Sequence, residues 1–141
     1  RQEGSRAMTS LATLPAFLGH FALGILLLVG AVTVHMRLTP HDELALIRDG
    51  NTGAAITLGG VVIGYAVPIG SAISHSFGVL DAAIWSVIAV IAQQGAFLVC
   101  TRVLLPDWRA ALEQRGELAG AVLKAAAAVA VGLLNAASLT T

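Results

Sequence analysis

Apolar residues in this chain gather into four long runs separated by short polar segments. The runs cover residues 14–36, 53–74, 82–101 and 118–139. Each approaches the roughly 20 apolar residues that an α-helix needs to cross a bilayer. The pattern therefore predicts an all-α membrane protein with four transmembrane helices.

The polar segments after the first and third runs resemble each other. Each begins at a proline and ends at a glycine, which suits a short helix, and we expect cytoplasmic helices at residues 40–50 and 106–116. The aligned positions are Pro40 with Pro106, Leu46 with Leu112 and Gly50 with Gly116.

This alignment predicts an internal duplication, with one two-span unit at residues 14–75 and a second at residues 76–141. A tail of residues 1–13 precedes them, and residues 1–7 are interpreted as a remnant ahead of a native start at Met8. Because each unit holds two spans, both units would face the same way, which gives a parallel repeat.

Charge is sparse and unevenly placed. The chain is 57% hydrophobic and 11% charged, with a formal net charge of zero, whereas a soluble domain carries about a quarter charged residues. The neutral balance argues against nucleic acid as a partner. By the positive-inside rule the two arginine-bearing loops are cytoplasmic and both termini lie outside. The loop arginines are Arg37, Arg48, Arg102, Arg109 and Arg115.

The stretch "GGVVIGYAVPIGSAISHS", residues 59–76, interrupts an apolar run with helix breakers and polar groups. Small residues four apart let two helices approach closely. Pro68 frees the carbonyl of Gly64, and that carbonyl must meet protein or water. The face is predicted either to pack against another helix or to line a site. Its packing residues are Gly59, Gly60, Gly64, Pro68 and, in the fourth run, Gly132.

Polar residues of all four spans fall in the outer half of the membrane or near its midplane. They form either a functional cluster or a set of ordinary interhelical hydrogen bonds. Gln93 and Gln94 are not expected to face the same centre, so one would face an oligomer partner. His35 is expected to be hydrated, and Lys124 to reach the cytoplasmic surface. The cluster comprises His20, Ser71, Ser74, His75, Gln93, Gln94, Asn135 and Ser138.

The first cytoplasmic helix has acidic residues in its first turn, where the helix dipole favours them. It is interpreted either as an interfacial helix on the membrane or as a docking surface for a protein partner. The docking residues would be Asp42, Glu43, Arg48 and Asp49.

Two segments, "LTPHDELALIRDGNTGAAITLGGVVIGYAVPIGSAISHS" and "AVGLLNAAS", resemble the YjfL-like family of small bacterial inner-membrane proteins. The resemblance extends over residues 14 to about 139. The second half lacks the pair of acidic residues that follows Pro40 in the first half, and it lacks the span that combines paired glycines with a proline. It implies a duplicated four-span protein of the bacterial inner membrane whose genes lie beside those of envelope-stress proteins. It implies no established activity.

No Walker loop, HExxH or GxSxG motif is present, and Ser71 with His75 lacks a third orienting group. We therefore expect no enzyme, no cofactor and no metal. The predicted function is a non-enzymatic inner-membrane subunit in envelope homeostasis that acts by helix packing, homo-oligomerisation and partner docking. The alternative is a small oligomeric channel or transporter with a polar pathway in the outer half of the membrane.

Overall fold

The computed structural model describes residues 11–39, 42–104 and 118–140, and across these residues it contains helices and no strand. Four helices are long and apolar enough to cross a membrane, which confirms the four predicted spans. The predicted helix at residues 106–116 and most of the N-terminal tail lie outside the described residues. The helices are α2 (Leu14–Leu38), α3 (Glu43–Arg48), α4 (Thr52–His75), α5 (Val79–Leu104) and α7 (Leu118–Ser138).

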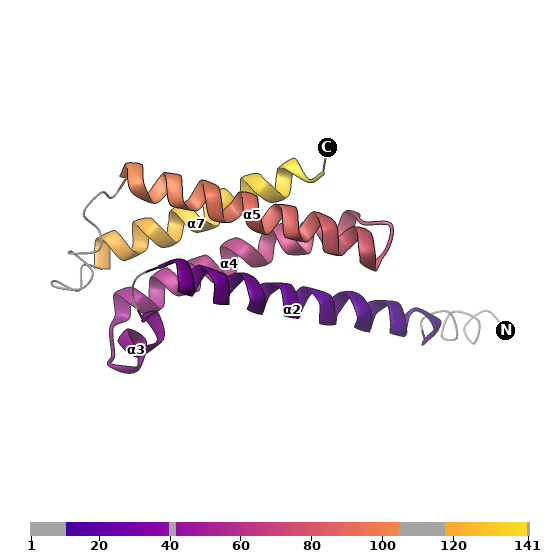
Figure 1. The fold of residues 1–141 in the computed structure, drawn as a ribbon, viewed down its shortest axis with the longest axis horizontal. Helices are drawn as coiled ribbons and strands as arrows, with labels where there is room; N and C mark the ends of the chain where they lie inside the picture. The colour runs from indigo at the N-terminus through magenta and orange to yellow at the C-terminus, as the bar shows by residue number, and fades with distance from the viewer. Residues whose placement is uncertain (1–10, 40–41, 105–117, 141) are drawn as a thin grey trace.

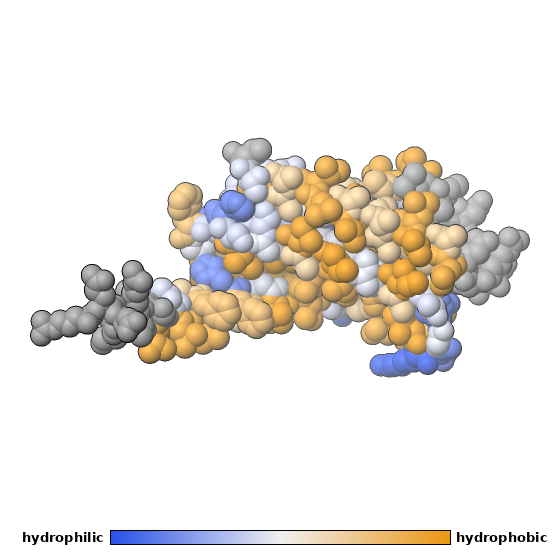
Figure 2. Space-filling view, turned by 180° about the vertical axis from the view of Figure 1, so that it is seen from behind, coloured by the Kyte–Doolittle hydropathy of each residue, from blue (hydrophilic) through white to orange (hydrophobic). Residues whose placement is uncertain are grey.

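The four long helices lie side by side in an elongated bundle (Figure 1). The short helix α3 caps one end, and the start of α2 and the end of α7 both lie at the opposite end (Figure 1). Helix α4 is central, because it contacts α2, α3, α5 and α7. Apolar side chains cover most of the spans, and hydrophilic ones lie toward both ends of the bundle (Figure 2).

The closest packing in the bundle lies between α4 and α7, where small residues allow the backbones to touch. A Cβ atom added to Gly60 would lie 2.5 Å from the Cα of Ala125, and one added to Gly64 would lie 2.6 Å from the carbonyl oxygen of Ala128. One added to Gly132 would lie 2.5 Å from the carbonyl oxygen of Gly64. Only glycine fits at these three positions.

Pro68 is buried inside α4, which continues as a helix from Thr52 to His75. The carbonyl of Gly64, which Pro68 deprives of its helical donor, faces the backbone of Gly132. The freed carbonyl thus meets protein, as the sequence required. Gly59 does not take part, because it is exposed and a Cβ there would have no neighbour within 4 Å.

This packing has a consequence for assembly. The prediction of a homo-oligomer rested on the small residues of α4 and α7, and apart from the exposed Gly59 the glycines among them, Gly60, Gly64 and Gly132, pack against the other helix of the same chain. An oligomer would therefore have to form through a different surface.

Side-chain caps and one glycine define the two ends of α3 and the start of α4. The Asp42 carboxylate caps α3 by accepting a hydrogen bond from the backbone N–H of Ala45 at 3.1 Å. Gly50 has a φ of 85°, a left-handed conformation that glycine adopts without cost, and it ends α3 as predicted. The Asn51 side chain then caps α4 at 2.9 Å from the N–H of Ala54.

We predict that Gly132→Ala destabilises the folded protein by about 1 to 3 kcal/mol, the usual cost of overpacking, because its new Cβ would collide with backbone. Gly59→Ala serves as the matched control, since open space surrounds that Cβ and alanine is the better helix former. Thermal unfolding in detergent measures both changes. An equal melting temperature for Gly132→Ala and Gly59→Ala would contradict the close contact.

Candidate functional site

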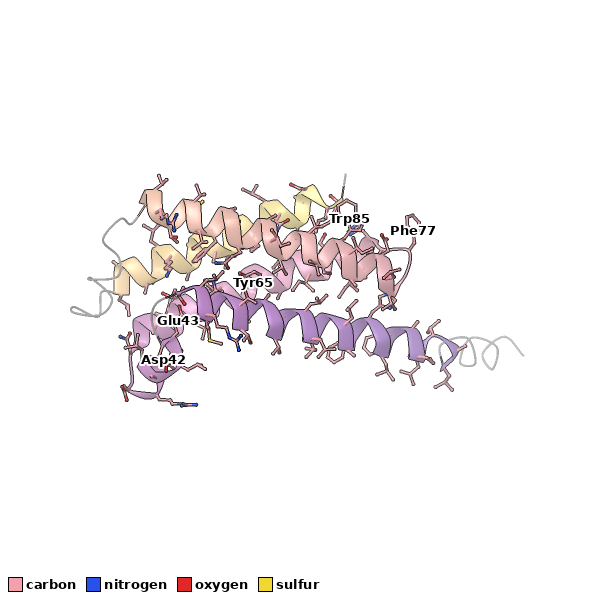
Figure 3. All side chains as sticks on the ribbon, in the orientation of Figure 1. Asp42, Glu43, Tyr65, Phe77 and Trp85 are labelled. Carbon is pink, nitrogen blue, oxygen red and sulfur yellow. The ribbon has the colours of Figure 1, made fainter. Side chains whose placement is uncertain are left out.

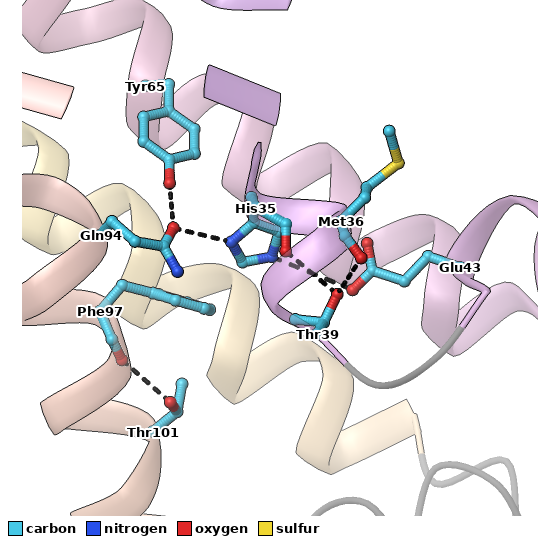
Figure 4. A network of polar contacts seen from close by, with 8 residues as sticks. All are labelled: His35, Met36, Thr39, Glu43, Tyr65, Gln94, Phe97 and Thr101. Carbon is cyan, nitrogen blue, oxygen red and sulfur yellow. Dashed lines mark hydrogen bonds and ion pairs between the residues drawn. The ribbon is translucent and has the colours of Figure 1, made fainter. Parts of the chain in front are cut away.

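A network of buried polar side chains lies in the bundle near the α3 end, and His35 is at its centre (Figure 4). His35 is fully buried, and its Nδ1 lies 3.0 Å from Oε1 of Gln94. The hydroxyl of Tyr65 donates to the same oxygen. An amide oxygen only accepts hydrogen bonds, so Nδ1 carries the hydrogen. In the neutral imidazole the other ring nitrogen, Nε2, then presents a lone pair.

The carboxyl of Glu43 faces that lone pair, with 4.0 Å between His35 Nε2 and Glu43 Oε1. Glu43 is only 5% exposed, although it is the first residue of α3. Its second oxygen, Oε2, has no hydrogen-bond partner among the described residues. Burial raises the pKa of Glu43, and the nearby charge of Lys124 opposes this rise. At 4.0 Å, Glu43 Oε1 and His35 Nε2 are too far apart for a hydrogen bond, and His35 Nε2 likewise has no hydrogen-bond partner among the described residues.

Lys124 contributes a buried positive charge to the same region. It is 1% exposed, and its ammonium lies 5.6 Å from the ring centroid of Phe97, within the range of a cation–π interaction. The prediction that Lys124 reaches the cytoplasmic surface was wrong. Lys124 shares the buried face of α7 with Ala121, Ala128 and Gly132, so the close α4–α7 contact directs it into the bundle.

The prediction that His35 is hydrated was also wrong. His35 lies one turn before the end of α2, where a straight helix would leave it at the membrane boundary. The chain turns back after α2 and brings the start of α3 over the ring, so Glu43 lies next to His35 instead of facing the cytoplasm (Figures 3 and 4).

Gln93 and Gln94 are both buried inside the chain, contrary to the expectation that one would face an oligomer partner. Gln94 meets α2 and α4 through His35 and Tyr65, whereas Nε2 of Gln93 donates to the carbonyl of Ala128 on α7 at 2.9 Å. Neighbouring residues point about 100° apart, but α5 contacts α2, α4 and α7. The side chains of Gln93 and Gln94 therefore both point into the bundle.

Asn135 extends the polar contacts from Gln93 toward the other end of the bundle. Its Nδ2 donates to the carbonyl of Ala89 at 2.7 Å and lies 3.5 Å from Oε1 of Gln93. Ser71 links α4 to α7 by donating to the carbonyl of Ala136 at 3.0 Å. Polar groups thus lie in a line along the bundle from Glu43 to Asn135, in two sets, because no hydrogen bond joins Gln94 or Tyr65 to Gln93 among the described residues.

The remaining members of the predicted outer cluster do not join this line. His20, Ser74, His75 and Ser138 each bond a carbonyl of their own helix, at distances of 2.7 to 2.9 Å. His75 and Ser138 line a cavity of 200 Å³ beside Trp85, whereas His20 lies in a separate crevice between α2 and α4. The structure therefore divides the predicted cluster into three places.

The predicted docking residues are divided as well. Asp42, Arg48 and Asp49 are exposed around α3, whereas Glu43 is buried. Glu43 also lines a crevice of 450 Å³ at this end of the bundle, together with Arg37, Thr39 and Asp42. One face of Glu43 thus borders the crevice and the other borders His35. Among the described residues no three His, Cys, Asp or Glu side chains gather closely enough to hold a metal ion.

Sequence reasoning missed the network of His35, Glu43, Tyr65 and Lys124, although one signal was present. Lys124 follows the small residues of α7 at helical spacing, with Ala121 before it and Ala128 and Gly132 after it. A lysine on that stripe must enter the bundle if the stripe packs against another helix.

These features define a small four-span membrane protein with ionisable side chains buried at one end of its bundle. Residues 8–139 match the family described as Domain of Unknown Function (DUF350), and the chain belongs to this family. It is 30% identical over 133 residues to the UPF0719 inner membrane protein YjfL of Escherichia coli, both in strain K12 and in O157:H7. Those alignments cover 94% of this chain and 99% of either relative.

No solved structure matches the chain. The family membership confirms the resemblance to the YjfL-like proteins. Together with the four apolar helices, it places the protein in the inner membrane as a multi-pass protein.

We predict that α3 packs less firmly against the bundle as the pH rises. The docked state binds the proton of Glu43 more tightly than an undocked α3, because burial raises the pKa above its ordinary 4.5. The stabilisation is complete below the ordinary pKa and is lost as the pH rises through the raised value. Hydrogen exchange of the α3 amides, corrected for intrinsic rates, measures this loss. Among the described residues, His35 and Lys124 are the titratable groups near the carboxyl, and Arg37 and Asp42 line the same crevice.

Two variants make this measurement specific. Glu43→Gln, which cannot ionise, should keep α3 protected at all pH values, and Asp49→Asn, at an exposed acid of the same turn, should behave like the wild type. If Glu43→Gln retains the wild-type pH dependence, Glu43 is not the group responsible.

Proposed function

We propose that this chain is a non-enzymatic membrane subunit that passes protons through its helical bundle, from the α3 end to the opposite end, as a small channel or transporter. The observation that carries the proposal is the buried pair of Glu43 and His35, with 4.0 Å between carboxyl oxygen and ring nitrogen. Ionisable side chains inside a membrane are costly to bury, and they typically mark ion or proton pathways.

The geometry gives each group a role. Glu43 borders the crevice and can take up a proton there, because burial favours its neutral form. One bridging water would carry that proton across the 4.0 Å to His35 Nε2. The Gln94 oxygen beside Nδ1 accepts hydrogen bonds from His35 and Tyr65 but does not take up a proton, so the imidazolium would pass its Nδ1 proton to a second water on that side. Histidine supports this exchange near neutral pH.

Lys124 supports release of the proton. When Glu43 is ionised, the ammonium of Lys124 compensates its buried negative charge. When Glu43 is neutral, it no longer compensates the buried positive charge of Lys124. A further proton on His35 would then be repelled by Lys124. Two fixed positive charges cannot both be stable in a medium of low dielectric constant, so the proton is not trapped. Gln93 and Asn135 continue the polar line toward the other end of the bundle.

We predict that Glu43→Gln lowers proton flux across liposomes that contain the purified protein by about a hundredfold, the lower end of what a positioned proton-transfer group contributes. Flux would be followed with an internal pH dye at about pH 5.5 and about pH 7.5, the range in which histidine titrates. Ser74→Ala is the control, because Ser74 is exposed and bonds only its own helix. Equal flux from Glu43→Gln and the wild type would refute the pathway.

A second candidate is a non-enzymatic subunit in envelope homeostasis that acts by homo-oligomerisation and partner docking. The exposed charges of Asp42, Arg48 and Asp49 around α3 favour it, since they leave a charged surface at one end of the bundle. This candidate needs α3 on the surface, whereas the proton pathway needs Glu43 in the interior.

A complementation assay separates the two candidates. In a bacterial strain that becomes sensitive to envelope stress when its own family member is deleted, the docking role predicts that Glu43→Gln restores resistance. A charge reversal, Arg48→Glu with Asp49→Lys, should then fail to do so. The proton pathway predicts the opposite pattern. Immunoblotting of the membrane fraction would confirm that both variants reach wild-type levels.

A further inference from the structure

An apolar crevice of 310 Å³ runs between α2 and α4, at the end of the bundle away from the ionisable network. His20 is the one polar side chain among its lining residues. The rings of Phe17 and Phe21 stack at 5.9 Å and form one edge. Its larger lining side chains are Phe17, Phe21, Ile25 and Leu28 of α2 and Ile69 and Ile73 of α4.

The surroundings of this crevice are hydrocarbon. Both walls are membrane-spanning helices, and α2 is the least buried of the four spans. From Phe17 to Leu28 the crevice follows twelve residues of α2, and the eleven steps between them span about 16 Å at a rise of about 1.5 Å per residue. One leaflet contributes about 15 Å to a hydrocarbon core of about 30 Å. The crevice is therefore as long as the acyl-chain layer of a single leaflet.

We propose that this crevice binds one acyl chain of a bilayer phospholipid, taken from the leaflet at the N-terminal end of α2. The proposal does not depend on the proton pathway. The lipid would lie along α2 with its polar end toward His20, which is nearer that end of the helix. Nδ1 of His20 donates to the carbonyl of Ala16 at 2.7 Å, so Nε2 of the neutral ring is an acceptor that can take a hydrogen bond from a hydroxyl of the lipid headgroup, such as those of phosphatidylglycerol.

The crevice is open on its α4 side because one of the residues that line it there is a glycine, which has no side chain. A Cβ added to Gly70, one of the lining residues, would have no neighbour within 4 Å. A larger side chain at this position would therefore fill the crevice without colliding with the protein. Gly59 of the same helix also has open space around its Cβ, but it does not line the crevice.

The test is native mass spectrometry of the delipidated protein titrated with a single phosphatidylglycerol. We expect the wild type and Gly59→Leu to retain one lipid per chain after collisional release of detergent, and Gly70→Leu to lose it. Ala66→Leu, at a second lining residue, should weaken binding in the same way if Gly70→Leu folds poorly.

Two results would overturn the proposal. One is equal lipid retention by Gly70→Leu and the wild type at equal melting temperatures, and the other is no retained lipid on the wild type. A parallel titration with stearic acid distinguishes the sources of the chain, because binding of stearic acid as tight as that of phosphatidylglycerol would show that the phosphate end is not recognised. Proton flux measured on the same Gly70→Leu sample should be unchanged.

Discussion

The contact between Gly64 and Gly132 fixes the distance at which α4 and α7 cross, and the other contacts in the bundle depend on it. In lipid, two helices gain little from apolar burial alone, so they associate where small residues let many atoms touch. Here the touching atoms are backbone, including the carbonyl that Pro68 leaves without a helical partner. The same contact thus provides close packing and covers a polar group that hydrocarbon could not solvate.

This crossing also determines which side chains are buried with it. The face of α7 that carries Gly132 carries Lys124 two turns earlier, so the lysine enters the bundle and meets Phe97. A buried ammonium is stable only near compensating charge or polar groups, and Lys124 is close enough to Glu43 to oppose the rise in its pKa, although burial has the larger effect. The position of α3 buries the Glu43 carboxyl beside His35, and the residues Asp42 and Gly50 define the ends of the helix.

The two ends of the bundle differ in chemistry. At the α3 end, Glu43 joins a crevice to the network of His35, Gln94 and Tyr65 (Figure 4). At the other end, His20 and His75 bond their own helices and border separate hollows. A polar side chain near a helix end can satisfy its hydrogen bonds locally, so similar depth in the membrane does not bring such residues together. The two-span repeat and the orientation of the termini remain predictions from the sequence.

Apolar run length by itself determined the number of spans, because a bilayer of fixed thickness needs a fixed length of apolar helix. Residue spacing placed Gly60, Gly64 and Pro68 on one face that had either to pack against another helix or to line a site, and Gly50 marked the end of α3. Only the tertiary structure decided what covers that face and which polar residues share a centre. Their depth in the membrane predicted that Glu43 and Lys124 would lie at the surface, but the fold buries both side chains. The physical reason is that burial depends on the direction each helix faces and on the segments that pack against it, whereas hydropathy records only depth in the membrane.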